Sequence, residues 1–133
     1  MTEYAKDLWQ RALKALESAK ALIKISPDDA ASRAYYSVFH AISAFFALQN
    51  KTFIKHSGLR AAVHRELIKT GRWSAELGIA FDIIWELRDT GDYGGVTHVT
   101  EEEAHQAVEK AHQAVEKAAR ILDVIKKDNS QLK

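Results

Sequence analysis

The sequence has no cysteine, one proline and only six glycines among its 133 residues. Without cysteine, the chain can form neither a disulfide nor a thiolate metal site, which fits a reducing compartment. No apolar run approaches the roughly 18 residues that cross a bilayer. The first ten residues, MTEYAKDLWQ, lack the basic and then apolar order of a signal peptide. We therefore expect a soluble, cytoplasmic protein that does not associate with a membrane.

Neither sign of charge is in excess, since the net charge is +1. The charges are nevertheless unevenly distributed. Residues 51–72 carry six basic side chains against the single acid Glu66, and residues 73–93 carry five acidic side chains against the single base Arg88. Two interpretations are open, namely two solvated helix faces that attract each other or a patch that binds phosphate.

Apolar residues recur at helical spacing, and few glycines or prolines interrupt them. This pattern predicts helices over about 3–25, 27–49, 57–71, 74–91 and 100–127, with residues 128–133 as a frayed tail. The length fits one domain over residues 1–133. Because most connections are short, we expect an all-α fold: an antiparallel up-and-down bundle of four long helices and one short helix.

Capping residues mark most of these helix starts. Ser26 precedes Pro27, which suits the first position of a helix. Ser57 and Ser74 are the expected caps of the third and fourth helices, and Thr100 with Glu103 forms a capping box. The segment AHQAVEK occurs twice in succession, at 104–110 and 111–117. Its small residues predict close packing of the fifth helix against a neighbour.

Arg88 breaks the pattern of the fourth helix, because it shares one sector of the helical wheel with the apolar residues Phe81, Ile84 and Leu87. A cation on a core face must find acceptors or folding is penalised. Arg88 is therefore either directed into a cleft that takes a phosphate, or it is a structural arginine that bonds carbonyls or Asp92 or pairs across an interface.

The second helix is apolar around most of its circumference, and its one polar stripe contains Arg33, Tyr36 and His40. This set is typical either of a site that binds an anion or a nucleic-acid base, or of a buried hydrogen-bond network.

His56 and Lys55 lie where the third helix starts, a position that attracts anions. The histidine spacing predicts no metal site and no phosphate-loop or hydrolase motif occurs, so we expect no metal and no cofactor.

Three segments together resemble small prokaryotic HEPN proteins. They are Ala31-Ser-Arg-Ala-Tyr-Tyr-Ser-Val-Phe-His-Ala41, Lys55-His-Ser-Gly-Leu59, and Arg88-Asp-Thr-Gly-Asp-Tyr93 with Val99-Thr-Glu-Glu-Glu-Ala104 after it. The resemblance implies a helical bundle that forms a homodimer. It also implies a partner, a minimal nucleotidyltransferase, in a toxin–antitoxin or defence system.

Many HEPN proteins are metal-independent ribonucleases that use an Arg-x4-6-His motif, and Arg88 matches its arginine. Tyr93 stands five residues later, where the commonest motif has histidine. A phenol is a poor general base at neutral pH compared with imidazole.

The residues and the resemblance together leave three candidate functions. The first is nucleotide or RNA binding, with the phosphate on Arg88, positioning by Tyr93 and Asp92, and further contacts from Arg33, Tyr36 and His40. The second is a structural or adaptor bundle, and the third is a ribonuclease whose base is His40 or His56.

Overall fold

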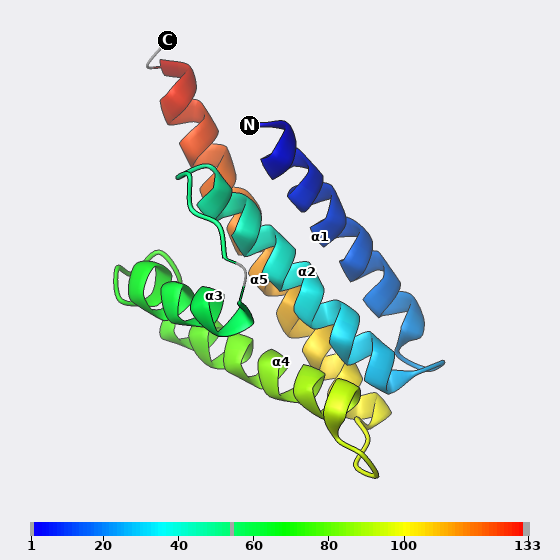
Figure 1. The fold of residues 1–133 in the computed structure, drawn as a ribbon. Helices are drawn as coiled ribbons and strands as arrows, with labels where there is room; N and C mark the ends of the chain where they lie inside the picture. The colour runs from blue at the N-terminus through cyan, green and yellow to red at the C-terminus, as the bar shows by residue number, and fades with distance from the viewer. Residues whose placement is uncertain (1, 54, 132–133) are drawn as a thin grey trace.

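A computed structural model describes residues 2–53 and 55–131, with side chains up to residue 120, and all regular structure in this part is helical (Figure 1). The predicted all-α class is therefore confirmed. The elements are α1 Glu3–Leu22, α2 Pro27–Ala47, α3 His56–Ala62, the π-helical turn η1 Val63–Ile68, α4 Ala75–Tyr93 and α5 Glu101–Gln131.

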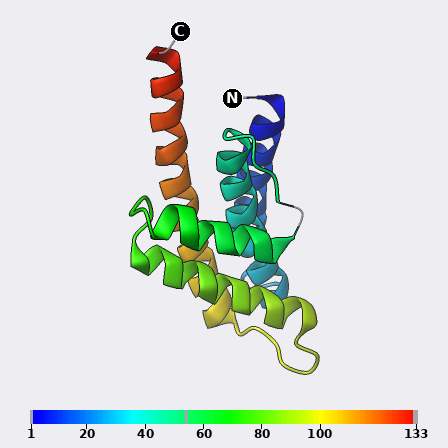
Figure 2. The same ribbon diagram turned by 60° about the vertical axis from the view of Figure 1, so that its left-hand side comes forward.

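Helix α2 is the central element, because it packs against α1, α4 and α5. Helices α1, α2 and α5 lie side by side as a bundle, and α3 and α4 cross it at an angle (Figures 1 and 2). Helices α1 and α2 run antiparallel, as do α3 and α4. None of the helices in the described part has the length and apolar character needed to cross a membrane.

Alanine allows the helices to approach one another closely. The repeat of α5 buries its alanines, as predicted, at positions Ala104, Ala107, Ala111 and Ala114, and Ala118 directly after it is also buried. Helix α2 contributes Ala30, Ala31, Ala34, Ala41 and Ala44. Large rings fill the remaining volume, and Tyr35, Phe46, Trp73 and Phe81 are all at most 1% exposed. Removing this apolar surface from water is the main favourable contribution to folding.

Two of the predicted caps are confirmed. The Ser74 hydroxyl accepts from the amide of Leu77 at 3.2 Å. Thr100 and Glu103 form the reciprocal box, with bonds of 3.1 and 3.0 Å. Ser26 occupies the expected position, but its hydroxyl donates to Asp29 instead of capping an amide.

The predicted cap at Ser57 is wrong, because Lys55, two residues earlier, occupies the capping position without a side-chain bond and α3 begins at His56. The predicted end of the fourth helix at Thr90-Gly91 is also wrong. Helix α4 continues to Tyr93, and the amide of Gly94 then bonds the Thr90 carbonyl at 2.9 Å. Helix α5 continues to Gln131, so the predicted tail is helical over 128–131, and residues 132 and 133 lie outside the described residues.

The crossing of α4 over the start of α2 explains Gly91, one of the two glycines inside α4. A Cβ atom at Gly91 would lie 2.7 Å from the backbone oxygen of Asp28. The Asp28 carboxylate accepts from the amide of Val99 and lies next to a ring nitrogen of His98, both at 2.7 Å. The Val99 hydrogen bond is the main cause that lowers the pKa of Asp28. Asp28 thus anchors the loop after α4 to α2.

Substituting Gly91 by alanine should destabilise the fold by about 1–3 kcal/mol, because the added methyl group overpacks the α2–α4 crossing. Gly58→Ala is the matched control, since its Cβ would meet only the Phe53 ring at 3.6 Å. That variant should be unchanged or more stable by up to about 1 kcal/mol, because alanine is the better helix former. Urea unfolding measures both, and equal stability of the two variants would contradict this account of the crossing.

Candidate functional site

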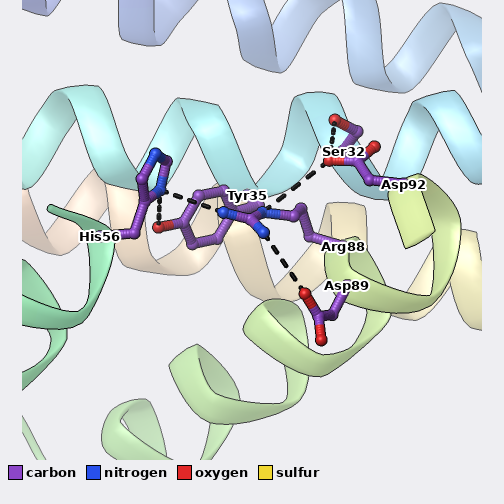
Figure 3. Close-up of polar contacts among 6 residues, drawn as sticks. All are labelled: Ser32, Tyr35, His56, Arg88, Asp89 and Asp92. Atoms are coloured by element: carbon purple, nitrogen blue, oxygen red, sulfur yellow. Dashed lines mark hydrogen bonds and ion pairs between the residues drawn. The ribbon is translucent and has the colours of Figure 1, made fainter. Parts of the chain in front are cut away.

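The side chain of Arg88 is 10% exposed and extends from α4 over the middle of α2, as Figure 3 shows. The predicted core-facing position is therefore correct. Phe81 and Ile84, two turns and one turn earlier on α4, are fully buried and fix the orientation of the helix. Because a guanidinium keeps its charge in proteins, a nearly buried one has to be compensated by acceptors.

Acceptors for Arg88 are few. Its Nη2 lies 3.1 Å from Nδ1 of His56, the one short contact that it makes with another side chain of the described part. Nη1 lies 3.5 Å from Oδ1 of Asp89, and Nε lies 3.9 Å from Oδ2 of Asp92. Nε is also buried without a hydrogen-bond partner among the described residues. Charge-assisted bonds normally measure about 2.7–2.9 Å, so neither carboxylate pairs fully with this cation.

Aromatic rings surround the guanidinium. Its Cζ atom lies 4.7 Å from the ring centroid of Tyr35, 5.5 Å from that of Trp85 and 5.9 Å from that of Tyr93. Contacts of this length are favourable cation–π interactions, and they are stronger where water is excluded. The rings therefore stabilise the charge without neutralising it.

His56 connects α3 to this arginine. Its Nδ1 lies 2.7 Å from the hydroxyl oxygen of Tyr35 as well as 3.1 Å from Nη2 of Arg88 (Figure 3). Arginine can only donate, so Nδ1 carries a lone pair and the proton of the neutral ring is on Nε2. Burial, and then the charge of Arg88, lower the pKa of His56. Burial raises the pKa of Tyr35 well above its ordinary value, so its hydroxyl stays protonated and can donate.

The polar stripe of α2 lies beside this cluster. The Arg33 guanidinium lies 4.9 Å from the ring centroid of Tyr36, and the Tyr36 and His40 rings are 6.0 Å apart. Tyr36 also meets His56 edge to face at 5.7 Å. His40 has a buried Nδ1 without a partner among the described residues, and its pKa is lowered by burial first and then by nearby arginines. Within the described part of the chain no polar contact joins His40 to Arg88.

Of the other expected residues, Tyr93 and Asp92 lie near Arg88, whereas no contact joins Lys55 to Arg88 in the described part of the chain. Tyr93 is 76% exposed at the end of α4, with its ring near Arg88. Asp92 lies near Nε of Arg88 and receives a long bond of 3.5 Å from the Ser32 hydroxyl (Figure 3). Lys55 is exposed before α3 and makes no ion pair with another described residue.

Sequence reasoning did not identify Tyr35 and Trp85 as part of this site, because both occur at apolar spacing, which predicts core positions. Tyr35 is fully buried and Trp85 partly buried, so their packing role is real. Tyr35 carries one usable signal, a hydroxyl on the most buried helix, because a buried phenol requires a hydrogen-bond partner.

A shallow groove of about 410 Å³ adjoins the site, lined by Arg60, Trp85, Glu86, Asp89, Thr90, Tyr93 and Gly94. Arg60 bonds Asp82 at 2.9 Å, so this pair joins the basic and acidic segments as the first interpretation of the charge pattern predicts. Among the described residues no group of three or more His, Asp or Glu side chains is arranged to hold a metal ion.

The protein is an all-helical bundle whose candidate site is a nearly buried arginine between aromatic rings. The sequence matches the HEPN domain family over residues 5–127, so the chain belongs to the HEPN family. A solved crystal structure, that of TT1696 from Thermus thermophilus, has the same fold, with a TM-score of 0.75 at 16% identity, over 90% of this chain and 98% of that one.

Several curated proteins are similar in sequence, among them one from Thermotoga maritima and one from Methanocaldococcus jannaschii. The UPF0332 protein of Thermotoga maritima is 34% identical over 91% of this chain and 93% of its own length. A protein of Methanocaldococcus jannaschii, named "Putative toxin MJ0142", is 33% identical over 73% of this chain and 67% of its own length. The predicted family is therefore confirmed, and one relative carries a name that refers to a toxin.

Replacing Arg88 by glutamine should raise the pKa of His56, because the charge of Arg88 is one of the two causes that lower it. Titration of the histidine ring signals by NMR measures the change. Arg65→Gln is the control, since Arg65 is exposed and its ion-pair partner is Glu66. An unchanged pKa of His56 in the Arg88 variant would show that the two groups do not interact in solution.

Proposed function

We propose that this HEPN protein binds the phosphate of RNA or of a nucleotide at Arg88. The observation that supports the proposal is a nearly buried guanidinium whose two nearby carboxylates lie at 3.5 and 3.9 Å and whose Nε has no hydrogen bond to a described residue. A phosphate oxygen accepts several N–H bonds at once, and arginine presents them in a matching fork.

A purely structural arginine is expected to behave differently. Buried ion pairs that contribute to stability need good geometry and saturated hydrogen bonds, since each desolvated charge costs several kcal/mol. Arg88 has a short bond to a neutral ring and two long contacts with carboxylates. The charge that remains uncompensated is what an anionic ligand would satisfy.

The site of the proposed ligand would extend to neighbouring side chains. Tyr93 and the groove beside it offer an exposed aromatic ring next to the arginine. Further contacts would come from the polar surface along α2 and from an exposed cation before α3, namely Arg33, Tyr36, His40 and Lys55. In this proposal Asp92, through its long contact with Nε, limits the positions that the guanidinium can take.

The biological setting in this proposal is that of a toxin-like HEPN protein, which agrees with the name of the Methanocaldococcus jannaschii relative. The chain would act as a cytoplasmic homodimer together with a nucleotidyltransferase, as the resemblance implies. Sedimentation equilibrium tests the first part, since the dimer has twice the mass of the chain. A nucleotidyltransferase gene beside this one would support the second part.

Arg88→Gln should weaken binding of a labelled single-stranded RNA at least tenfold, or about 1.4 kcal/mol, because the charge and the donor fork are lost together. Arg88→Lys should give an intermediate affinity, since lysine keeps the charge without the fork. Fluorescence anisotropy at one fixed salt concentration measures the affinities, with Arg65→Gln as the matched control.

Circular dichroism and urea unfolding establish that each variant is folded before binding is compared. If folded Arg88→Gln binds RNA and a mononucleotide as tightly as the unchanged protein, the phosphate-binding proposal is wrong and the adaptor function gains support.

A ribonuclease is the third function considered from the sequence, and the Tyr93 ring, which stands where the commonest HEPN motif has histidine, lies beside Arg88. His56 reaches Arg88, but its Nδ1 lone pair already faces two donors and is not free to take a proton from a substrate. His40, the other expected base, makes no polar contact with the arginine in the described part of the chain.

Tyr93→His should therefore gain metal-independent RNA cleavage of at least about 100-fold over the unchanged protein, which is the lower range of general-base catalysis. The assay is cleavage of a labelled RNA in the presence of a chelator. The double variant Tyr93→His with Arg88→Gln should lose the gain. If Tyr93→His is folded and cleaves no faster, the two positions do not form a catalytic pair.

A further inference from the structure

Two donors converge on one acceptor atom in this protein, Nδ1 of His56, which lies within 3.1 Å of both the Tyr35 hydroxyl and the Arg88 guanidinium. The ring itself is fixed, because it stacks on Phe39 at a centroid distance of 4.6 Å and on Tyr35 at 5.5 Å. Its position relative to the arginine is thus set by packing on α2, the central helix.

We propose that His56 is a positioning residue. Its neutral imidazole, which Tyr35 and Phe39 hold in place, keeps the Arg88 guanidinium away from the carboxylates of Asp89 and Asp92 on the same helix. This inference rests on the proposed function, because it explains how the cation stays available for a phosphate. Asp89 and Asp92 follow Arg88 on the same helix, and Asp92 is one turn away, a spacing at which ion pairs form readily. Without a competing acceptor, the arginine would pair with them.

The charge of the acceptor at position 56 determines whether Arg88 keeps its net positive charge. A carboxylate at position 56 would hold the guanidinium at least as well, but it would also neutralise it. A neutral nitrogen orients the arginine through a hydrogen bond and leaves its full positive charge uncompensated. The two long carboxylate contacts, at 3.5 and 3.9 Å, are the structural consequence of that arrangement.

Three substitutions of His56 separate positioning from folding. Asparagine places a neutral oxygen where Nδ1 lies, aspartate places a charged oxygen there, and leucine has a similar volume without an acceptor. The probe is the labelled single-stranded RNA, and urea unfolding of each variant is measured in parallel.

His56→Leu and His56→Asp should each bind the RNA at least tenfold more weakly than the unchanged protein. His56→Asn should bind at least fivefold more tightly than His56→Leu. His56→Asp should be no less stable than His56→Leu, because an acid in the first turn of α3 is favourable and gains Arg88 as a partner. His56→Asp should also bind at least fivefold more weakly than His56→Asn, and this loss should not follow the stability that urea unfolding measures, which a merely structural role would require.

His105→Asp is the matched control for net charge, since His105 is exposed on α5, away from this cluster. It should bind as the unchanged protein does. If His56→Asp binds no more weakly than His105→Asp, or if the asparagine and leucine variants bind equally, the positioning role is wrong. If Arg88→Gln also retains full affinity, the proposed function itself fails, so the two failures are distinguishable.

Discussion

The hydrogen bond between Arg88 and Nδ1 of His56 is the interaction on which the site depends. It joins the end of α4 to the start of α3, and the hydroxyl of Tyr35 on α2 approaches the same nitrogen. Three helices therefore converge on one neutral acceptor. Because that acceptor carries no charge, the arginine is oriented and partly satisfied but not neutralised, in a place where water is largely excluded. Electrostatic interactions are stronger there than at the surface.

The fold brings these three helix segments together through small residues and tight crossings. The ring of Tyr35 packs against His56 of α3 and against Phe81 and Trp85 of α4, so it is fully buried and its hydroxyl has to find a partner. Gly91 lets α4 cross the start of α2, next to the carbonyl of Asp28. The Asp28 carboxylate then holds the amide of Val99, which anchors the loop that follows Tyr93. These contacts near the end of α4, together with the buried side chains of Phe81 and Ile84, fix the position of Arg88 over α2.

Much of this arrangement could be predicted from the sequence, because it follows from periodicity. Arg88 stands out as the charged residue on an apolar face, and Thr100 with Glu103 gives a cap that needs no tertiary information. The pairing of His56 with Arg88 could not be predicted, since the two residues are 32 positions apart and meet only in the folded chain. The π-helical turn after α3 has no recognisable signal. The predicted cap at Ser57 is wrong, and Ser26 occupies its predicted cap position but bonds the Asp29 side chain instead of an amide, because side-chain capping depends on competition between local hydrogen-bond partners.

The tautomer of His56 tests the central claim most directly. A long-range proton–nitrogen NMR correlation at neutral pH distinguishes a protonated from an unprotonated ring nitrogen. The account predicts that Nδ1 of His56 gives the shift of an unprotonated nitrogen that accepts a hydrogen bond, and that Nε2 carries the proton. A protonated Nδ1 at neutral pH would contradict the account, because that nitrogen could not then accept a bond from Arg88.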